Sequence, residues 1–442
     1  MPLPARPARR SGYTLSTLIL FLVIARSAPL CRAQTTPPRD FNPRQLTAAG
    51  IRILEGRHVQ LLTDLPRSPA VDELPQVFDA AIPQWAEYFE VDRNAVRGRW
   101  LAFLIKDREK FAALNLLPSE NPNFINGYAR GYELWLMEQP SDYYRRHLLL
   151  HEGTHAFMQT QLGGAGPGWY MEGTAELLGT HAWRNNRLHL RDLPATREAV
   201  PMWGRIKLIR DAVEKQQAWP LNAVLEVNNR RPLDTDVYAW TWALATLLDK
   251  HPRFTERFRA LKEHVADERF NDRFREAFAD DWSDLVVEWD VFVRTLDYGY
   301  DVERMATIHK PAEPIEGRSA RTTIAADRGW QSTGWLLRAG REYRITASSR
   351  FQIAEDAQPW PSEPAGVTIE YHEGRPLGQL LGSLRTTGRS AGSFGEPIPI
   401  GLAATVKPEA DAILYLRVND SPARLGDNDG DVAVRIEPAP NR

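Results

Sequence analysis

The sequence predicts an α+β fold in two parts: a small mixed sheet followed by helices, and then an all-β sandwich. The first observation is a set of strand-length apolar runs between residues 59 and 137, followed by segments with helical spacing up to residue 296. The second is a change near residue 300, after which short β-like runs alternate with Gly, Pro, Asn and Asp. The third is the length of 442 residues, which exceeds what one hydrophobic core usually supports.

Residues 1–33 are predicted to be a secretory signal peptide that does not belong to the fold. Arginines at positions 6, 9 and 10 form a positive n-region. The apolar h-region from Leu15 to Ala25 is too short to span a bilayer, which needs about 20 apolar residues. Ala33 offers a cleavage point, so we expect a secreted or periplasmic protein.

Cys31 is the only cysteine, and it leaves two other interpretations of the leader open. The cysteine could be acylated in a lipoprotein, although Leu30 stands before it where a small residue is expected. The leader could also remain as an uncleaved membrane anchor. No later segment is apolar enough to span a membrane. With one cysteine at most, the fold cannot depend on disulfides.

The charge balance of the mature chain argues against one class of partner. The formal net charge is -2, and removal of the five arginines of the leader leaves about -7. Nucleic-acid binding favours a basic face. We therefore expect no nucleic-acid partner.

The elements of the first part are predicted in chain order. Strands are expected at 59–63 and 100–105, and a further extended segment runs from Gly127 to Met137. Helical spacing predicts helices over 71–89, 141–162, 172–183, 197–215, 236–250, 253–280 and 282–296. Ser141 is the expected N-cap of the second of these helices. Strands of the second part are expected at 343–346, 367–371, 413–418 and 432–436.

One pentapeptide, His151-Glu152-Gly153-Thr154-His155, has the pattern HExxH. Residues four apart lie on one face of a helix, so His151 and His155 can bind one metal ion. Glu152 can then accept a proton from an attacking water molecule. The alternative is two ordinary histidines and a glutamate. The flanking apolar residues, 148–150 and 156–158, instead indicate a buried helix, where these polar groups need a partner.

A catalytic zinc ion usually takes three protein ligands, so a further ligand is needed after the pentapeptide. A Gly-rich turn at 163–168 is followed by Trp169-Tyr-Met-Glu172-Gly-Thr-Ala-Glu176. HExxH followed by W-x-x-E-G-x-A-E resembles the gluzincin superfamily of zinc peptidases, and its bacterial members in particular. The resemblance covers roughly residues 50–300, and it is specific at 148–180.

The resemblance implies roles for further residues. Glu172 would be the third zinc ligand, and Glu176 the carboxylate that hydrogen-bonds a ligand histidine. The segment from Asp236 to Leu244 resembles the helix that carries an oxyanion-stabilising tyrosine, which makes Tyr238 the candidate donor. The alternatives are a solvated carboxylate at 172 and a tyrosine packed between helices at 238. His147, His181 and His189 are further candidate donors.

A strand near Asn126, Gly127 and Tyr128 is expected, by the same resemblance, to be the edge strand that pairs with the substrate backbone. Gly127 and Gly131 would leave room for this close approach. The alternative is an ordinary internal strand.

The last part of the chain, from about residue 318 to 440, carries a second resemblance. Its motifs are Gly329-Trp-Gln-Ser-Thr-Gly334, Ala339-Gly340, Gly374-Arg-Pro-Leu-Gly378, Val418-Asn-Asp420 and Gly426-Asp-Asn-Asp-Gly430. They resemble the bacterial calcium-dependent galactose-binding lectins, a small β-sandwich whose final loop holds calcium. Asp420, Asp427 and Asn428 fall on matching positions. Arg424 stands where the family has a Thr that contributes its backbone carbonyl.

The acidic residues of this final loop favour calcium without any resemblance. Asp420, Asp427, Asp429 and Asp431 cluster around a Gly-bearing loop, and calcium prefers such oxygen ligands. The alternative is a polar hairpin turn, because Asp, Asn and Gly are also good turn residues.

Taken together, these observations predict five parts and a function. The parts are a signal peptide (1–33), a linker (34–48), a zinc metallopeptidase-like domain (49–300), a connector (301–318) and a lectin-like β-sandwich (319–442). We expect a secreted zinc metallopeptidase acting on peptides or proteins, with Ca²⁺ and carbohydrate as possible ligands of the last domain. The alternatives are a carbohydrate- or surface-binding protein with a degenerate peptidase domain, and a zinc hydrolase of a non-peptide amide.

Overall fold

The computed structural model describes residues 39, 41–228, 234–315, 319–355, 357–387 and 392–439. The predicted signal peptide and nearly all of the linker before residue 41 lie outside these ranges. The described residues belong to one compact unit, residues 33–442. Within them, no helix is long and apolar enough to cross a membrane.

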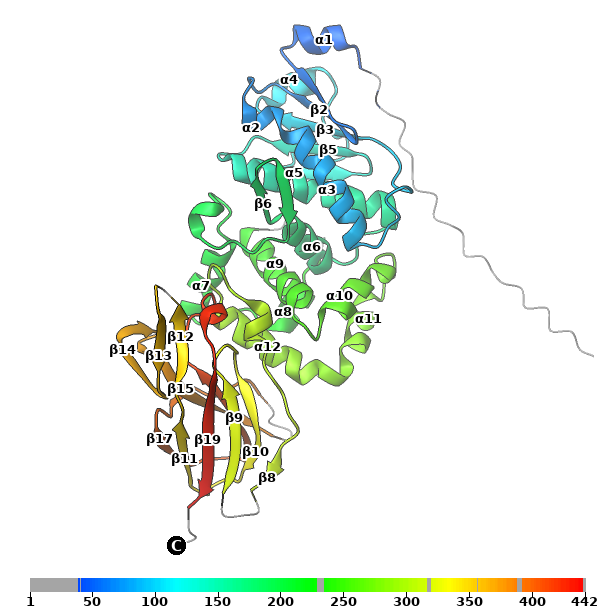
Figure 1. The fold of residues 1–442 in the computed structure, drawn as a ribbon. Helices are drawn as coiled ribbons and strands as arrows, with labels where there is room; N and C mark the ends of the chain where they lie inside the picture. The colour runs from blue at the N-terminus through cyan, green and yellow to red at the C-terminus, as the bar shows by residue number, and fades with distance from the viewer. Residues whose placement is uncertain are drawn as a thin grey trace, which may run out of the picture. The chain divides into compact units, whose positions relative to one another are not determined.

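The first part is built on a five-stranded mixed sheet of order β1-β2-β3-β5-β4 (Figure 1). The strands β2, β3 and β5 run parallel, and β1 and β4 are antiparallel edge strands. Their bounds are β1 Arg52–Glu55, β2 Val59–Thr63, β3 Trp100–Ile105, β4 Gly127–Arg130 and β5 Glu133–Met137. The mixture of this sheet with many helices confirms the predicted α+β class.

The sheet is buried on both faces, which explains why its strands read as continuous apolar runs. On β3, Trp100, Ala102 and Leu104 belong to the core shared with the helices α3 (Leu74–Tyr88) and α5 (Asp142–Phe157). Phe103 and Ile105 of the same strand belong to a separate core on the other face. Successive side chains of a strand point to opposite faces, so one strand serves both cores.

The helix α5 carries the pentapeptide HExxH across this sheet. It begins after Ser141, the predicted N-cap, whose hydroxyl accepts a hydrogen bond from the Tyr144 N–H. A π-helical turn, Met158–Leu162, follows its last residue. The helices α6 (Gly168–Gly179) and α9 (Thr235–Lys250) pack on each other, and α6 also packs on α5. The helix expected at 172–183 thus begins and ends four residues earlier.

The remaining elements of the first part surround these helices. They are α1 Pro43–Ala48, α2 Pro69–Asp72, α4 Arg108–Ala113, β6 His181–Arg184, β7 Arg187–Leu190, α7 Arg205–Glu214, α8 Leu221–Leu225, α10 Thr255–Ala260, α11 Phe270–Ala277, α12 Trp282–Thr295 and α13 Val302–Met305.

The segment Gly127–Met137 was expected to be one strand, and it is a hairpin of β4 and β5. The chain reverses at Gly131, which has a φ of 55°. Glycine adopts this left-handed conformation without steric penalty. The Gly131 N–H donates to Gln159 Oε1 at 2.8 Å, which fixes the turn to the end of the α5 region.

Two segments expected to be connections contain regular structure. Residues 43–48 of the predicted linker form α1, with Asn42 as N-cap and Leu46 buried against the sheet. In the predicted connector, α13 is followed by a short strand, β8 (Glu313–Pro314), that pairs with β10 (Gln331–Leu337). Both are short elements that depend on tertiary packing, so local composition does not reveal them.

The second part consists of two main sheets around one core. A six-stranded sheet has the order β14-β15-β18-β10-β8, with β16 paired to β15, and a four-stranded sheet has the order β17-β11-β19-β9. The core between them includes Ile345, Leu414, Leu416 and Val434. Other bounds are β9 Ala320–Ala325, β11 Tyr343–Ser348, β12 Phe351–Glu355, β13 Pro359–Ser362, β14 Ala365–His372, β15 Arg375–Thr386, β16 Ile398–Pro399, β17 Ala403–Val406, β18 Ala412–Val418 and β19 Asp431–Pro438.

Gly153 provides a test of how closely α5 packs on α3. A Cβ atom at this position would lie 2.6 Å from Cη2 of Trp85 and 3.0 Å from a ring carbon of Phe78. We expect Gly153→Ala to lower the free energy of unfolding by about 1–3 kcal/mol, because overpacking outweighs the gain in helix propensity. Denaturant unfolding measures this change. Gly395→Ala, whose Cβ would meet only ordinary contacts, is the control, and equal stability of the two variants would contradict the packing.

Candidate metal centre

The centre begins with two histidines on one face of α5. His151 and His155 are both buried, and their Nε2 atoms lie 3.0 Å apart. The rings stand edge to face with centroids 4.6 Å apart, so both nitrogens point to the same region. Glu152, between them in sequence, is buried as well. The spacing of four residues therefore brings the two imidazoles together on one face of the helix, as predicted.

Glu172 on α6 completes a triangle of ligand atoms. Its Oε2 lies 3.2 Å from His151 Nε2 and 3.3 Å from His155 Nε2. Ligand atoms of a tetrahedral zinc site, at about 2.0–2.1 Å from the metal, are about 3.3–3.4 Å from one another. Glu172 Oε2 is buried and accepts no hydrogen bond from the described residues. The three donor atoms therefore fit a zinc ion.

The charges around the triangle also suit a dication. Three buried carboxylates lie here, those of Glu152, Glu172 and Glu176, with the single guanidinium of Arg205. When both ligand histidines are neutral, the net charge of this buried group is about -2, which is costly without a counter-ion.

The pKa values of these groups reflect the same burial and the same accumulation of charge. Burial raises the pKa of Glu152, although the neighbouring histidines lower it in part. Burial also acts to raise the pKa of Glu172, but the contacts with His155 and His151 dominate and lower it to about 2. For His151, burial lowers the pKa, whereas the adjacent carboxylates of Glu172 and Glu176 raise it well above the usual value. The pocket thus favours positive charge.

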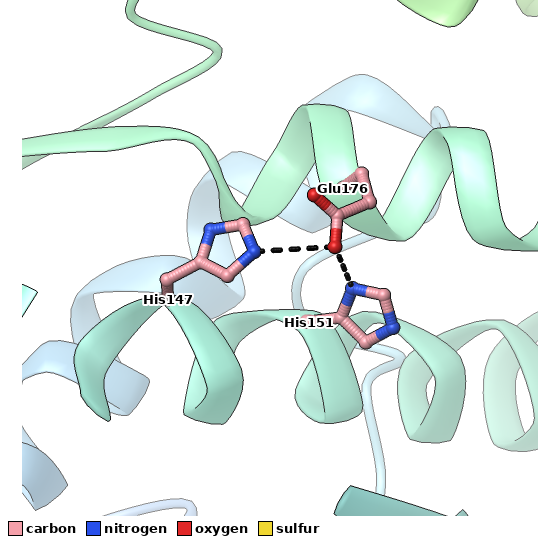
Figure 2. A group of neighbouring side chains, drawn as sticks. All are labelled: His147, His151 and Glu176. Carbon is pink, nitrogen blue, oxygen red and sulfur yellow. Dashed lines mark hydrogen bonds and ion pairs between the residues drawn. The ribbon is translucent and has the colours of Figure 1, made fainter. Parts of the chain in front are cut away.

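Glu176, one turn after Glu172, lies against the opposite nitrogen of His151 (Figure 2). Its Oε1 is 3.3 Å from His151 Nδ1 and 3.3 Å from His147 Nε2. Arg205 at the start of α7 donates to both oxygens of Glu176, from Nε and Nη2, each at 2.9 Å. With its carboxylate 3.3 Å from His151 Nδ1, Glu176 favours the proton on that nitrogen, which leaves the Nε2 lone pair of the ring free to face Glu172.

A second group, His147, His151 and Glu176, is also spaced closely enough for a metal ion. The guanidinium of Arg205 already occupies both oxygens of this carboxylate. A cation placed there would face a buried positive charge. Burial also lowers the pKa of His147, which keeps the ring neutral with one N–H to donate. This group is therefore better suited to hydrogen bonding, and the triangle is the better candidate for a metal ion.

Tyr238, in the first turn of α9, lies beside the triangle as the resemblance implied. Its ring is edge-on to His151 with centroids 5.8 Å apart, and the guanidinium of Arg205 lies 5.6 Å from the ring centre. Its hydroxyl makes no hydrogen bond to any described residue; residues 229–233, before α9, lie outside the description. Burial and the nearby carboxylates raise its pKa, so the hydroxyl stays protonated and can donate.

The strand β4 lies at the edge of the sheet and directly against Glu152. A Cβ atom on Gly127 would lie 2.2 Å from Glu152 Oε1, so no side chain fits at this position. The Asn126 carbonyl accepts from the Met137 N–H at 2.7 Å, and Tyr128 pairs with Trp135. In an antiparallel ladder the intervening residue points its N–H and C=O away from the partner strand. The backbone groups of Gly127 therefore face the open edge.

The three other candidate histidine donors are not available. His181 donates from Nδ1 to the Gly179 carbonyl at 2.8 Å and accepts at Nε2 from Arg146 at 3.3 Å. His147 contacts Glu176, and His189 on β7 is exposed. Among the candidates, Tyr238 is the one that lies beside the triangle and has no hydrogen-bond partner among the described residues.

Arg205 is the functional residue that sequence reasoning missed. It lies 29 positions after Glu176, in a helix that follows a left-handed Gly204. No spacing or motif connects the two residues. Only the packing of α7 against the site elements brings this guanidinium to the carboxylate.

In the second part, the expected calcium ligands gather around the loop between β18 and β19. Asp420 is fully buried, and its Oδ1 accepts from the Ser421 N–H at 2.6 Å. Asp420 Oδ2, Asp427 Oδ1 and Asn428 Oδ1 are buried and accept no hydrogen bond from the described residues. Burial raises the pKa of Asp420 to about 6, and the charge of Asp427 adds to this. Three unpaired oxygens of this kind fit a calcium ion.

The other acidic residues of this loop are placed differently. Asp429 and Asp431 are exposed. The backbone of Asp429 pairs with that of Gln352, and Arg424 forms an ion pair with Glu370. The sequence cluster of four aspartates therefore divides into two that face the candidate site and two that face solvent.

Comparison with known proteins gives limited similarity. No family model matches the chain, and no curated protein matches it. One similar solved structure is "EclA N-terminal domain; PllA-like lectin", at 21% identity and a TM-score of 0.21, covering 27% of this chain and 98% of that one. Another is Aeromonas hydrophila PliG, a periplasmic lysozyme inhibitor of g-type lysozyme, at 7% identity and a TM-score of 0.18, covering 30% and 97%.

Replacement of Glu176 tests the supporting role of its carboxylate. We expect Glu176→Gln to weaken zinc binding by about 10–100-fold, because His151 loses the anionic carboxylate that orients it and Arg205 loses its counter-ion. Competition with a chromophoric chelator measures the affinity of the folded protein. Glu288→Gln, at another buried glutamate, is the control and should bind zinc as the wild type does. Equal affinity of the two variants would show that Glu176 does not support the centre.

Proposed function

We propose that this protein is a secreted zinc-dependent metallopeptidase of the gluzincin type. The observation that carries the proposal is the triangle of His151 Nε2, His155 Nε2 and Glu172 Oε2, with edges of 3.0–3.3 Å. Glu152 lies beside this triangle, between it and the open edge of a sheet. The combination suits hydrolysis of an extended peptide.

The residues of the site have separate roles in the proposed reaction. Zinc, when bound, supplies Lewis-acid chemistry that polarises a carbonyl group and makes water a nucleophile near neutral pH. Glu152 accepts the proton of the attacking water and delivers it to the leaving amine. Tyr238 donates its hydroxyl hydrogen to the oxygen on which negative charge develops. Glu176 and Arg205 hold the ring of His151 in place.

The edge of β4 favours a peptide over a non-peptide amide as the substrate. Gly127 presents its N–H and C=O to the open edge, and a peptide can add there as a further strand through main-chain hydrogen bonds. Because Gly127 also abuts Glu152, a peptide bound at this point passes close to the base. A small amide without an extended backbone would make no use of this edge.

A second candidate function, calcium binding by the last domain, is favoured by the three unpaired oxygens of Asp420, Asp427 and Asn428. Calcium would neutralise the two buried carboxylates and satisfy the amide oxygen. Carbohydrate binding by this domain stays a prediction of the lectin resemblance.

Digestion of a peptide library tests the proposed activity. We expect the wild type to cleave peptides, a zinc chelator to abolish cleavage, and Glu152→Gln to lower kcat/KM by about 10²–10⁴-fold because the base is lost. Zinc content of the variant should equal that of the wild type, since Glu152 is not a ligand. Glu87→Gln, at an exposed glutamate on α3, is the matched control.

Two results would contradict the peptidase proposal. A folded wild type that binds no zinc would remove the metal centre. Full activity of Glu152→Gln would remove the role of the base and leave the metal centre standing.

Thermal unfolding with and without calcium tests the second candidate. We expect calcium to raise the Tm of the wild type, by an amount that corresponds to about 2.7 kcal/mol at 100 times Kd. Asp420→Asn should abolish most of this shift, because a buried anionic ligand is lost. Asp431→Asn, at an exposed position, should keep it. A wild type whose Tm does not respond to calcium would leave the loop as a hydrogen-bonded turn.

A further inference from the structure

A buried arginine in the second part lacks a carboxylate partner. Arg417 on β18 is 6% exposed. It donates from Nη2 to the Asp420 carbonyl at 2.9 Å and from Nε to the Val418 carbonyl at 3.4 Å, and it lies 5.6 Å from the ring centre of Trp330. In the described part of the chain, no carboxylate is within ion-pair distance of it. A buried charge without a counter-ion is costly.

A second arginine, which forms no ion pair with the described residues, lies near the first. Arg375 begins β15 and pairs with His372 across the β14–β15 turn. Its side chain makes one long contact, 3.5 Å to the carbonyl of Glu373. Burial lowers the pKa of Arg417; Tyr300 and the charges of Asp420 and Glu373 raise it in part, and the positive charge of Arg375 lowers it.

This arrangement is fixed by Asn419, two residues after Arg417. The Asn419 amide donates to the carbonyls of His372, Arg375 and Pro376 at 3.1, 3.2 and 3.0 Å. The end of the β14–β15 hairpin is therefore bound to β18. The two arginines are held near each other by the backbone and not by flexible side chains alone, which is the condition for a preorganised site.

Both arginines line a cavity of about 550 Å³, a volume within the range of small-molecule sites. Apolar and aromatic walls come from Trp330, Leu381 and Phe394. The other charged groups of the lining fall into two sets. Arg294 forms an ion pair with Asp290, and Arg210 forms one with Asp297. The glutamates at 214, 373 and 396 are exposed. Of the unpaired charged side chains of the lining, Arg417 is buried and Arg375 half-buried, whereas the three glutamates are exposed.

We propose that this cavity binds a small organic carboxylate, with the carboxylate between Arg375 and Arg417 and the apolar body against Trp330 and Phe394. Guanidinium groups bind carboxylates through paired, charge-assisted hydrogen bonds. The anion would supply the counter-charge that the described residues do not. This site is separate from the metal centre and does not depend on the peptidase proposal.

Binding of matched probes to the mature chain tests the site. The probes are phenylacetate, phenyl phosphate and the neutral phenylacetamide, each added up to about 10 mM and followed by calorimetry and tryptophan fluorescence. We expect saturable binding of phenylacetate and none of phenylacetamide. Arg375→Gln should weaken binding at least about 10-fold, because one charge-assisted contact is lost. Arg294→Gln, which lines the same cavity but pairs with Asp290, should change it less than about 2-fold.

Arg417→Gln is the stronger variant, but it removes a buried group and could prevent folding. Arg375 is only half-buried, so its variant keeps the proposal open to refutation. Absence of phenylacetate binding, equal binding of phenylacetamide, or unchanged affinity of Arg375→Gln would overturn it. Binding of phenyl phosphate without phenylacetate would overturn the choice of a carboxylate.

Discussion

The buried ion pair between Glu176 and Arg205 is the contact on which the geometry of the candidate metal centre depends. It joins α6 to α7, and it fixes the carboxylate that contacts Nδ1 of His151, the ring nitrogen on the side away from Glu172. Without the guanidinium, Glu176 would be an isolated buried anion, and its burial would raise its pKa. With it, the pKa of Glu176 is well below the usual value, and the carboxylate stays ionised beside the imidazoles of His147 and His151. The orientation of the His151 ring is thus determined by Glu176 and Arg205, which are not themselves candidate ligands.

The proposed base is positioned by a different part of the fold. Glu152 belongs to the same helix as the ligands, but its carboxylate lies against Gly127 on β4. Helix and edge strand meet there because α5 packs on β4 and β5. In the proposed function, the strand would align a peptide beside the carboxylate of Glu152, next to the candidate metal ligands. The arrangement requires the strand to carry no side chain at this point.

Sequence reasoning predicted what depends on local spacing. His151, Glu152 and His155 follow from helical periodicity, and Glu172 and Glu176 follow from a motif one helix later. Arg205 could not be predicted, because its contact with Glu176 is made by tertiary packing alone. The hairpin at Gly131 was missed because its two strands form an almost continuous apolar run. The unpaired state of Arg417 is likewise invisible in sequence, where an arginine in an alternating strand indicates a solvent-facing position.

The strand β3 contributes side chains to two hydrophobic cores at once. Trp100, Ala102 and Leu104 serve the core beneath α5, while Phe103 and Ile105 serve the core on the other side of the sheet. Because one strand contributes to both cores, loss of packing on either face would disturb the other. We therefore expect the backbone amides of β3 to exchange slowly, since elements rich in buried apolar contacts open last.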